Sequence, residues 1–84
     1  MKIRFTKHAL EKFEVLKQHR ILVSRNRVLN TVIAPEYTDH RRAPLVIAQS
    51  TLDINRVLRV VYKKEQDDIK IITFYPGRKS QYEK

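Results

Sequence analysis

A histidine near the amino terminus is the first residue of this chain whose type and position fit chemistry. His8 stands two residues after Thr6 in the segment FTKHALEKF, residues 5–13, and Thr6 is suited to cap a helix. A neutral imidazole with a free ring nitrogen can act as a general base. The alternative is a structural ring that bonds Thr6 or a neighbouring strand, and the motif alone favours that alternative.

The run TFYPGRKSQY, residues 73–82, is the second concentration of functional groups. It interleaves two tyrosines, Tyr75 and Tyr82, with two basic side chains, Arg78 and Lys79. Aromatic rings can stack on exposed bases, whereas Arg and Lys can bind phosphates. The alternative is a basic carboxyl-terminal tail over residues 76–84 with a frayed end.

Two further arginine positions are candidates for contact with an anion. Arg59 lies inside the apolar run RVLRVVYKK. It either binds an anion or lays its aliphatic stem on apolar surface with its charged head in water, and the sequence leaves both open. Arg41 and Arg42 form a weaker cluster in a polar segment, and we interpret them as solvated.

Several kinds of chemistry have no motif in this chain. The sequence contains no phosphate-binding glycine loop, no H-E-x-x-H motif and no cysteine. Its three histidines, His8, His19 and His40, are widely separated along the chain. The sequence therefore predicts neither a metal site nor a cofactor.

The charge balance indicates a polyanionic partner. Eighteen Lys and Arg oppose nine Asp and Glu among the 84 residues, which gives a net charge of +9 with neutral histidine. The excess is distributed along the chain, because residues 1–42 carry +6 and residues 43–84 carry +3. A basic domain of this kind typically meets nucleic acid, although an acidic protein partner is the alternative.

Length and composition predict one cytoplasmic domain, residues 1–84, with no membrane attachment. The amino-terminal MKIRFTKH has no apolar run of the kind a signal peptide needs. The longest uncharged stretch, residues 43–52, is much shorter than the roughly 20 residues of a membrane span. Small secreted domains often depend on disulfides, so the absence of cysteine favours the cytoplasm.

Hydrophobic periodicity and turn signals predict an α+β fold in the order β-α-α-β-β-β. Two amphipathic helices are expected, one from Lys7 to about Gln18 and one between the cap Ser24 and Pro35. The expected strands cover residues 2–5, 44–51, 56–64 and 69–75, and residues 36–44 read as a loop. Two helices should pack on one face of a mostly antiparallel sheet.

The last two strands carry apolar groups on both faces. In residues 69–75, for example, the set Ile69, Ile71, Thr73 and Tyr75 alternates with Lys70, Ile72 and Phe74. Two short helices can cover one face of such a sheet. Either the twisted sheet curls over part of its second face, or a partner covers it.

The motifs named above resemble those of a small prokaryotic domain family of unknown function. The matching segments are FTKHALEKF, SRNRVLNTVIAPE, RVLRVVY and IKIITFY. The family pattern is a T-x-H-A start, a helix that ends in proline, and strands that finish in threonine. This family is grouped with the RelE-like and BrnT-like ribonuclease toxins, of the barnase–colicin–RelE type, which share a β-α-α-β-β-β fold. The resemblance covers nearly the whole chain through short, degenerate motifs.

The resemblance implies metal-independent cleavage of RNA. In that reaction a base removes the proton of a 2′-hydroxyl, which attacks the adjacent phosphate while cations stabilise the transition state. His8 would be the base, Arg59 would bind the phosphate, and Thr73 would orient one of them through a hydrogen bond. The implied RNA-binding residues are Lys12, Tyr75, Arg78, Lys79 and Tyr82. Lys12 stands where the family often has arginine, so it keeps the charge but loses the bidentate fork.

Three hypotheses about function follow. The first is an endoribonuclease toxin that acts on RNA, with ribosome-associated mRNA as one form of its substrate. The second is a non-catalytic module that binds nucleic acid or an acidic protein, in which His8 has no chemical role. The third, compatible with both, is a toxin whose uncovered sheet face is filled by an acidic, helical antitoxin. The first requires His8 and Arg59 to converge on one open cleft.

Overall fold

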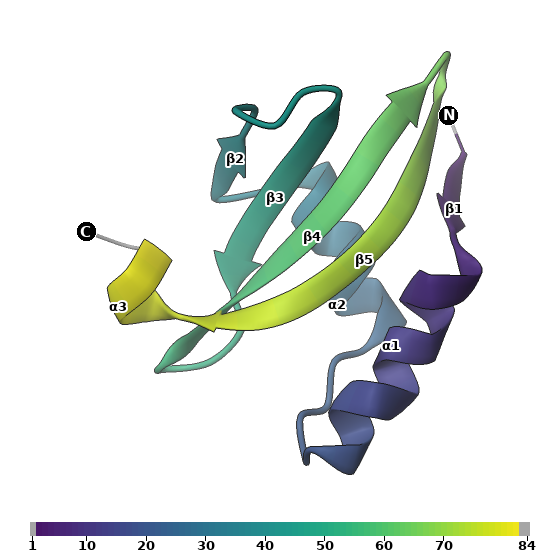
Figure 1. The fold of residues 1–84 in the computed structure, drawn as a ribbon. Helices are drawn as coiled ribbons and strands as arrows, with labels where there is room; N and C mark the ends of the chain where they lie inside the picture. Colours follow the sequence, from purple (N-terminus) through teal and green to yellow (C-terminus); the bar gives the residue numbers. More distant parts are fainter. Residues whose placement is uncertain (1, 83–84) are drawn as a thin grey trace.

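A five-stranded sheet with two helices on one side is the core of this α+β protein (Figure 1). The computed structural model describes residues 2–82. Their elements are β1 (Ile3–Phe5), α1 (Lys7–Gln18), α2 (Arg25–Ile33), β2 (Tyr37–Asp39), β3 (Leu45–Thr51), β4 (Arg56–Glu65), β5 (Asp68–Arg78) and α3 (Lys79–Tyr82). The strand order is β1-β5-β4-β3-β2. β1 runs parallel to β5, and the other pairs are antiparallel.

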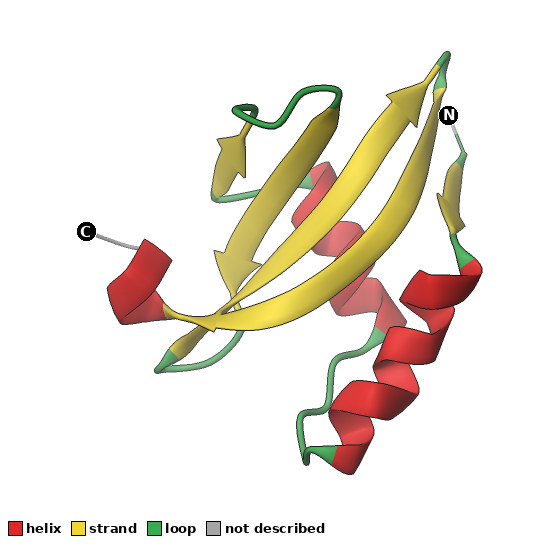
Figure 2. Ribbon diagram, viewed as in Figure 1, coloured by secondary structure: helices red, strands yellow, loops and turns green. Residues whose placement is uncertain are grey.

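The two long helices, α1 and α2, cover one face of the sheet, and neither of them lies on the opposite face (Figure 2). α1 packs on β5 and β1, whereas α2 packs on β3 and β4. The core between the layers is apolar and consists of Ala9, Leu16, Val28, Val32, Leu58, Val60, Ile69, Ile71 and Phe74. We call the uncovered side the open face. No helix within residues 2–82 has the length and apolarity needed to span a membrane.

Both predicted helix starts are confirmed, and one of them also anchors the sheet. Thr6 Oγ1 and Ser24 Oγ accept hydrogen bonds from the first turns of α1 and α2. Thr6 Oγ1 also donates to the carbonyl oxygen of Ile72 in β5, at 3.0 Å. One threonine therefore caps α1 and attaches it to the neighbouring strand.

A β-bulge at Ile72 decides which residues of β5 face the core. Val61 pairs with Thr73 and Tyr62 pairs with Ile71, so Ile72 is the extra residue. Strict alternation from Ile71 would place Phe74 on the open face, but the bulge shifts the register by one residue. Ile71 and Phe74 both point to the helices as a result, and both are fully buried.

The structure corrects the sequence-based boundaries at three places. The expected loop at residues 36–44 contains strand β2, which pairs with β3 through Tyr37 and Asp39. β5 continues through Pro76 and Gly77 instead of stopping at Tyr75, because β4 extends beside it as far as Arg56. The predicted tail then forms the short helix α3, and its last residues, 83–84, lie outside the described part of the chain.

Candidate functional site on the open face

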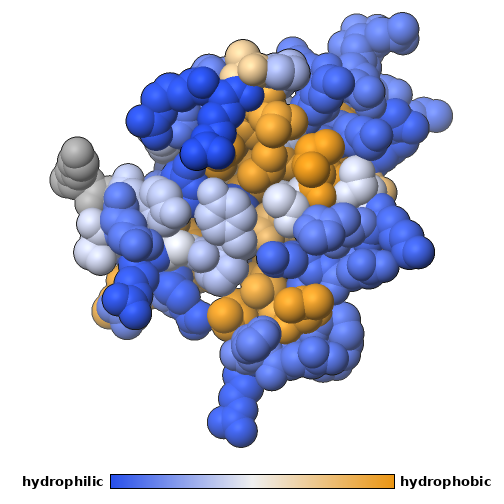
Figure 3. Space-filling view, viewed as in Figure 1, coloured by the Kyte–Doolittle hydropathy of each residue, from blue (hydrophilic) through white to orange (hydrophobic). Residues whose placement is uncertain are grey.

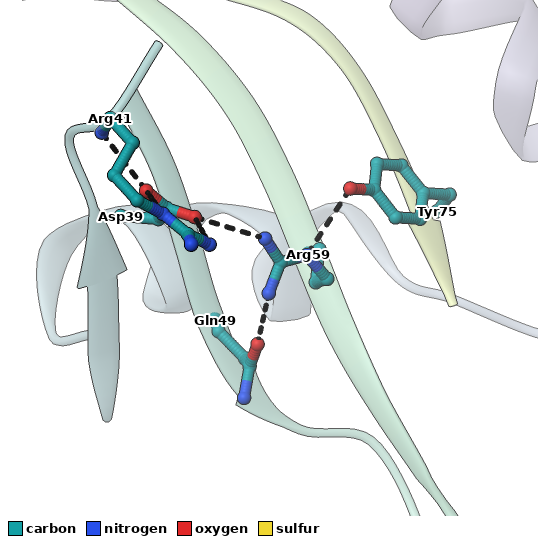
Figure 4. Close-up of polar contacts among 5 residues, drawn as sticks. All are labelled: Asp39, Arg41, Gln49, Arg59 and Tyr75. Carbon is teal, nitrogen blue, oxygen red and sulfur yellow. Dashed lines mark hydrogen bonds and ion pairs between the residues drawn. The ribbon is translucent and has the colours of Figure 1, made fainter. Parts of the chain in front are cut away.

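A buried arginine lies at the centre of the open face (Figure 4). Arg59 points away from the helices because its neighbours in β4, Leu58 and Val60, belong to the core. It is 5% exposed. Its Nε donates to the hydroxyl of Tyr75 at 3.1 Å, and its Nη1 donates to Oε1 of Gln49. A buried guanidinium needs hydrogen-bond partners, and here Gln49 in β3 and Tyr75 in β5 supply two of them.

Asp39 supplies the negative charge near this arginine and connects it to Arg41. Its Oδ2 lies 3.7 Å from Nη2 of Arg59 and 2.7 Å from Nη2 of Arg41. The backbone amide and Nε of Arg41 also donate to Oδ1 of Asp39. These hydrogen bonds from Arg41, together with the charge of Arg59, hold the pKa of Asp39 far below its usual range. The carboxylate is therefore charged whenever the protein is folded near neutral pH.

The ring of Tyr82 covers the guanidinium of Arg59. The Cζ atom of Arg59 lies 4.1 Å from the centroid of that ring, which is a close cation–π contact. Gly77 makes this contact possible, because a Cβ atom at position 77 would collide with the Tyr82 ring. Gly77 is the single glycine of the chain. Helix α3 is thereby anchored over the open face, and the predicted tail is part of the site.

Two pockets open beside Tyr82. One, of about 420 Å³, lies between Tyr37 and Tyr82 and is bordered by Arg41, Arg59 and Gln81. Tyr37 is 50% exposed and Tyr82 is 38% exposed, so each ring keeps a surface for a ligand. The other, of about 320 Å³, has a mixed polar and apolar lining of Asp39, Arg41, Arg42, Leu45, Ile47, Arg59, Val61, Tyr75 and Tyr82.

The structure does not form the single cleft that the ribonuclease mechanism required. His8 is exposed on α1, which packs on the helix-covered face, whereas Arg59 belongs to the open face. Lys12 is also on α1. The five-stranded sheet therefore lies between the proposed base and the proposed phosphate-binding arginine. The expectation that His8 and Arg59 converge was wrong. Ala9 and Leu16 bury their side chains in the core, so α1 packs on the face of the sheet opposite to Arg59.

The other predicted site residues have mixed outcomes. Tyr75 and Tyr82 do meet Arg59. Arg78 and Lys79 line a neighbouring pocket of about 720 Å³ with Asp53–Arg56. Thr73 does not orient Arg59 or His8, because its buried hydroxyl has no hydrogen-bond partner among the described residues.

Sequence analysis missed three members of this site, Tyr37, Asp39 and Gln49, and it interpreted a fourth, Arg41, as solvated. Tyr37, Asp39 and Arg41 were assigned to a loop because their run is short and polar. One usable signal was the spacing Asp39-x-Arg41, at which an aspartate can accept bonds from the backbone and side chain two residues on. Gln49 gives no comparable local signal, because its partner Arg59 lies in another strand.

Neither the arrangement of possible metal ligands nor similarity to known proteins assigns a function to this site. Within residues 2–82 no group of three or more histidine, aspartate or glutamate side chains is arranged to hold a metal ion. Comparisons of the chain with protein-family models, with curated proteins and with solved structures found no match.

Replacing Thr73 by valine is expected to leave stability unchanged or to raise it by up to about 1 kcal/mol. The reason is that the substitution removes a buried hydroxyl without a partner and keeps the branched shape. Urea unfolding of wild type and Thr73→Val measures the difference. A loss of more than about 1 kcal/mol would indicate that this hydroxyl has a partner in solution.

Acid should weaken the fold through Asp39. Its folded pKa lies below the value of about 3.9 in an unfolded chain. The stabilisation is therefore complete above about pH 5 and is lost as the pH falls through 4 toward the folded pKa. The free energy of unfolding, measured with urea between pH 2 and pH 7, should depend less steeply on pH near pH 3 in Asp39→Asn than in wild type. The difference corresponds to at most one proton fewer taken up on unfolding. Asp53→Asn is the matched comparison, because Asp53 is also an aspartate with a lowered pKa but lies in a different turn. Parallel curves for wild type and Asp39→Asn would contradict this role of Asp39.

Proposed function

We propose that the protein binds single-stranded RNA on its open face. The observation that carries this proposal is the pocket between Tyr37 and Tyr82, with Arg41 at its border. Two exposed aromatic rings beside an arginine are the groups that single-stranded RNA engages, through stacking of bases and binding of phosphates. The net charge of +9 supports a polyanionic ligand.

In this proposal the exposed groups contact RNA and the buried groups hold them in place. Arg41 has a side chain that is 83% exposed, and Asp39 fixes it through Nε and Nη2, which leaves other N–H donors for a phosphate. Arg59 is buried and its charge is balanced by Asp39, so it acts as a positioning residue. Its guanidinium lies against the Tyr82 ring, and Tyr82 is still 38% exposed, which leaves ring surface for a base.

Metal-independent RNA cleavage on the same face is a second candidate. The guanidinium groups of Arg41 and Arg59 lie around one pocket with the tyrosines, and such cations can stabilise the charge of a phosphate transition state. An ionised tyrosine would have to replace His8 as the base, and water would have to supply the proton that the leaving 5′-oxygen takes up. The order of elements is compatible with the RelE-like or BrnT-like fold, and the toxin grouping with an acidic antitoxin stays a proposal that rests on the resemblance.

Incubation of the purified protein with end-labelled RNA in the presence of a chelator tests both candidates. RNA binding predicts a salt-sensitive complex with intact RNA. Cleavage predicts products that require the 2′-hydroxyl, so a 2′-deoxy substrate of the same sequence is the control. His8→Ala should behave as wild type in either case. No complex at 50 mM salt would rule out the proposed function.

A further inference from the structure

A row of three basic residues crosses the open face at the end remote from Tyr82. Lys70 in β5 pairs directly with Arg4 in β1 on one side and with Lys63 in β4 on the other. Arg4 points away from the helices, because its neighbours Ile3 and Phe5 pack against the core. The three residues therefore share one face of three adjacent strands. We call them the cationic row.

The two lysines of this row, Lys63 and Lys70, lie directly opposite each other and carry like charges. Residues directly opposite on neighbouring strands have Cβ atoms about 4.5–5.5 Å apart, and like charges at that distance destabilise a sheet. Two carboxylates lie near the row: Glu65 pairs with Arg4 at 3.7 Å and offsets its charge, and Asp68 accepts a bond from the backbone amide of Lys2. Within residues 2–82, neither Lys63 nor Lys70 forms an ion pair.

Leu45 lies between the cationic row and the loop beside the pocket of Tyr37 and Tyr82, which we call the tyrosine pocket. Lys63 pairs with Leu45 at the start of β3, and the amide of Leu45 bonds the carbonyl oxygen of Arg42. Arg41 and Arg42 belong to the loop between β2 and β3; both line the pocket of about 320 Å³, and Arg41 also borders the tyrosine pocket. In Figure 1 this path follows the top of the sheet from the β2–β3 loop to β1. Figure 3 shows hydrophilic groups at both ends of this edge and an apolar strip between them.

We infer that the cationic row binds backbone phosphates of the same RNA strand whose base occupies the tyrosine pocket. This inference rests on the proposed function and adds the direction and length of the ligand. Two strand spacings separate Lys63 from Arg4, or about 10 Å. A helically stacked strand advances about 3.4 Å per nucleotide, so the row extends the contact by about three nucleotides. The RNA then crosses the strands of the sheet from α3 toward β1.

Salt dependence of RNA binding tests this inference. The ligand is a fluorescent uridine decamer, and the variant is the double substitution Lys63→Gln and Lys70→Gln. The matched control is Lys17→Gln with Lys64→Gln, which removes the same charge from two exposed lysines, one on α1 and one at the outer end of β4. For single strands each lost phosphate contact lowers the slope of log K against log salt by about 0.7. The row variant should therefore lose about 1.4 from the slope and bind about 25-fold more weakly at 0.1 M salt.

The possible outcomes distinguish the inference about the cationic row from the proposed function. A slope that falls in the row variant and stays within about 0.3 of wild type in the control supports the inference. Equal slopes in the two double variants, while wild type binds, would overturn the inference and leave the proposed function in place. Failure of the wild-type protein to bind the decamer would overturn both. Circular dichroism of each variant checks that the fold is kept.

Discussion

Replacing Tyr82 by alanine is expected to weaken binding of single-stranded RNA by about 5-fold to 150-fold. A base that stacks on an aromatic side chain contributes about 1–3 kcal/mol, and each 1.4 kcal/mol changes an equilibrium constant tenfold. The ring of Tyr82 is held between Gly77 and the guanidinium of Arg59, with 38% of the residue exposed. Fluorescence anisotropy with a uridine decamer at fixed salt measures the loss.

Two variants control this experiment. Tyr82→Phe keeps the ring and its contact with Arg59, so it should bind within about threefold of wild type. Gly77→Ala tests the same contact from the other side, because its Cβ displaces the ring, and it should bind more weakly. If Tyr82→Ala binds RNA as tightly as wild type, or more tightly, then Tyr82 covers the site instead of forming part of it.

Replacing Arg59 by alanine is expected to lower the free energy of unfolding by about 3–5 kcal/mol, because it removes one partner of a buried polar network. The substitution leaves Gln49 Oε1 and the Tyr75 hydroxyl without their donor, and it opens a space beneath Tyr82. Arg59→Met fills more of that space and should cost less. Urea unfolding compares the two variants.

Arg56→Ala is the matched control, because Arg56 lies on the same strand but is partly exposed. It pairs with Asp53 at 2.8 Å, and exposed pairs of this kind contribute at most about 1 kcal/mol. Equal stability losses for Arg59→Ala and Arg56→Ala would contradict a structural role for the Arg59 network. The positioning role also predicts that Arg59→Lys fails to restore RNA binding, since an ammonium cannot reproduce the planar fork that meets Tyr75 and Gln49.

The helices and long strands were predictable because their signals are local. Thr6 and Ser24 are cap residues followed by apolar periodicity, and Pro35 follows the end of α2. The β-bulge was not predictable in this way. Nothing in the alternation of residues 69–75 marks Ile72 as the extra residue, because its position depends on the pairing of β5 with β4 and on the Thr6 hydroxyl.

The site was predictable only where its residues give local signals. Arg59, Tyr75 and Tyr82 were noticed as unusual residue types, and the structure places them in contact. The partnership of Arg59 with Gln49 and Asp39 joins three strands, so it depends on sheet register. His8 was assigned to the site by motif, but no local pattern states which face of the sheet a helix covers.

Titration of the isotopically labelled protein with a uridine decamer, followed by NMR chemical shifts, tests the central claim most directly. If RNA lies on the open face, the amide signals of Tyr37, Arg41 and Tyr82 should shift most, with those of Lys63 and Lys70 following. The exposed residues of α1 and α2 should shift little. Shifts concentrated on α1 and α2, with the open face unchanged, would contradict the account.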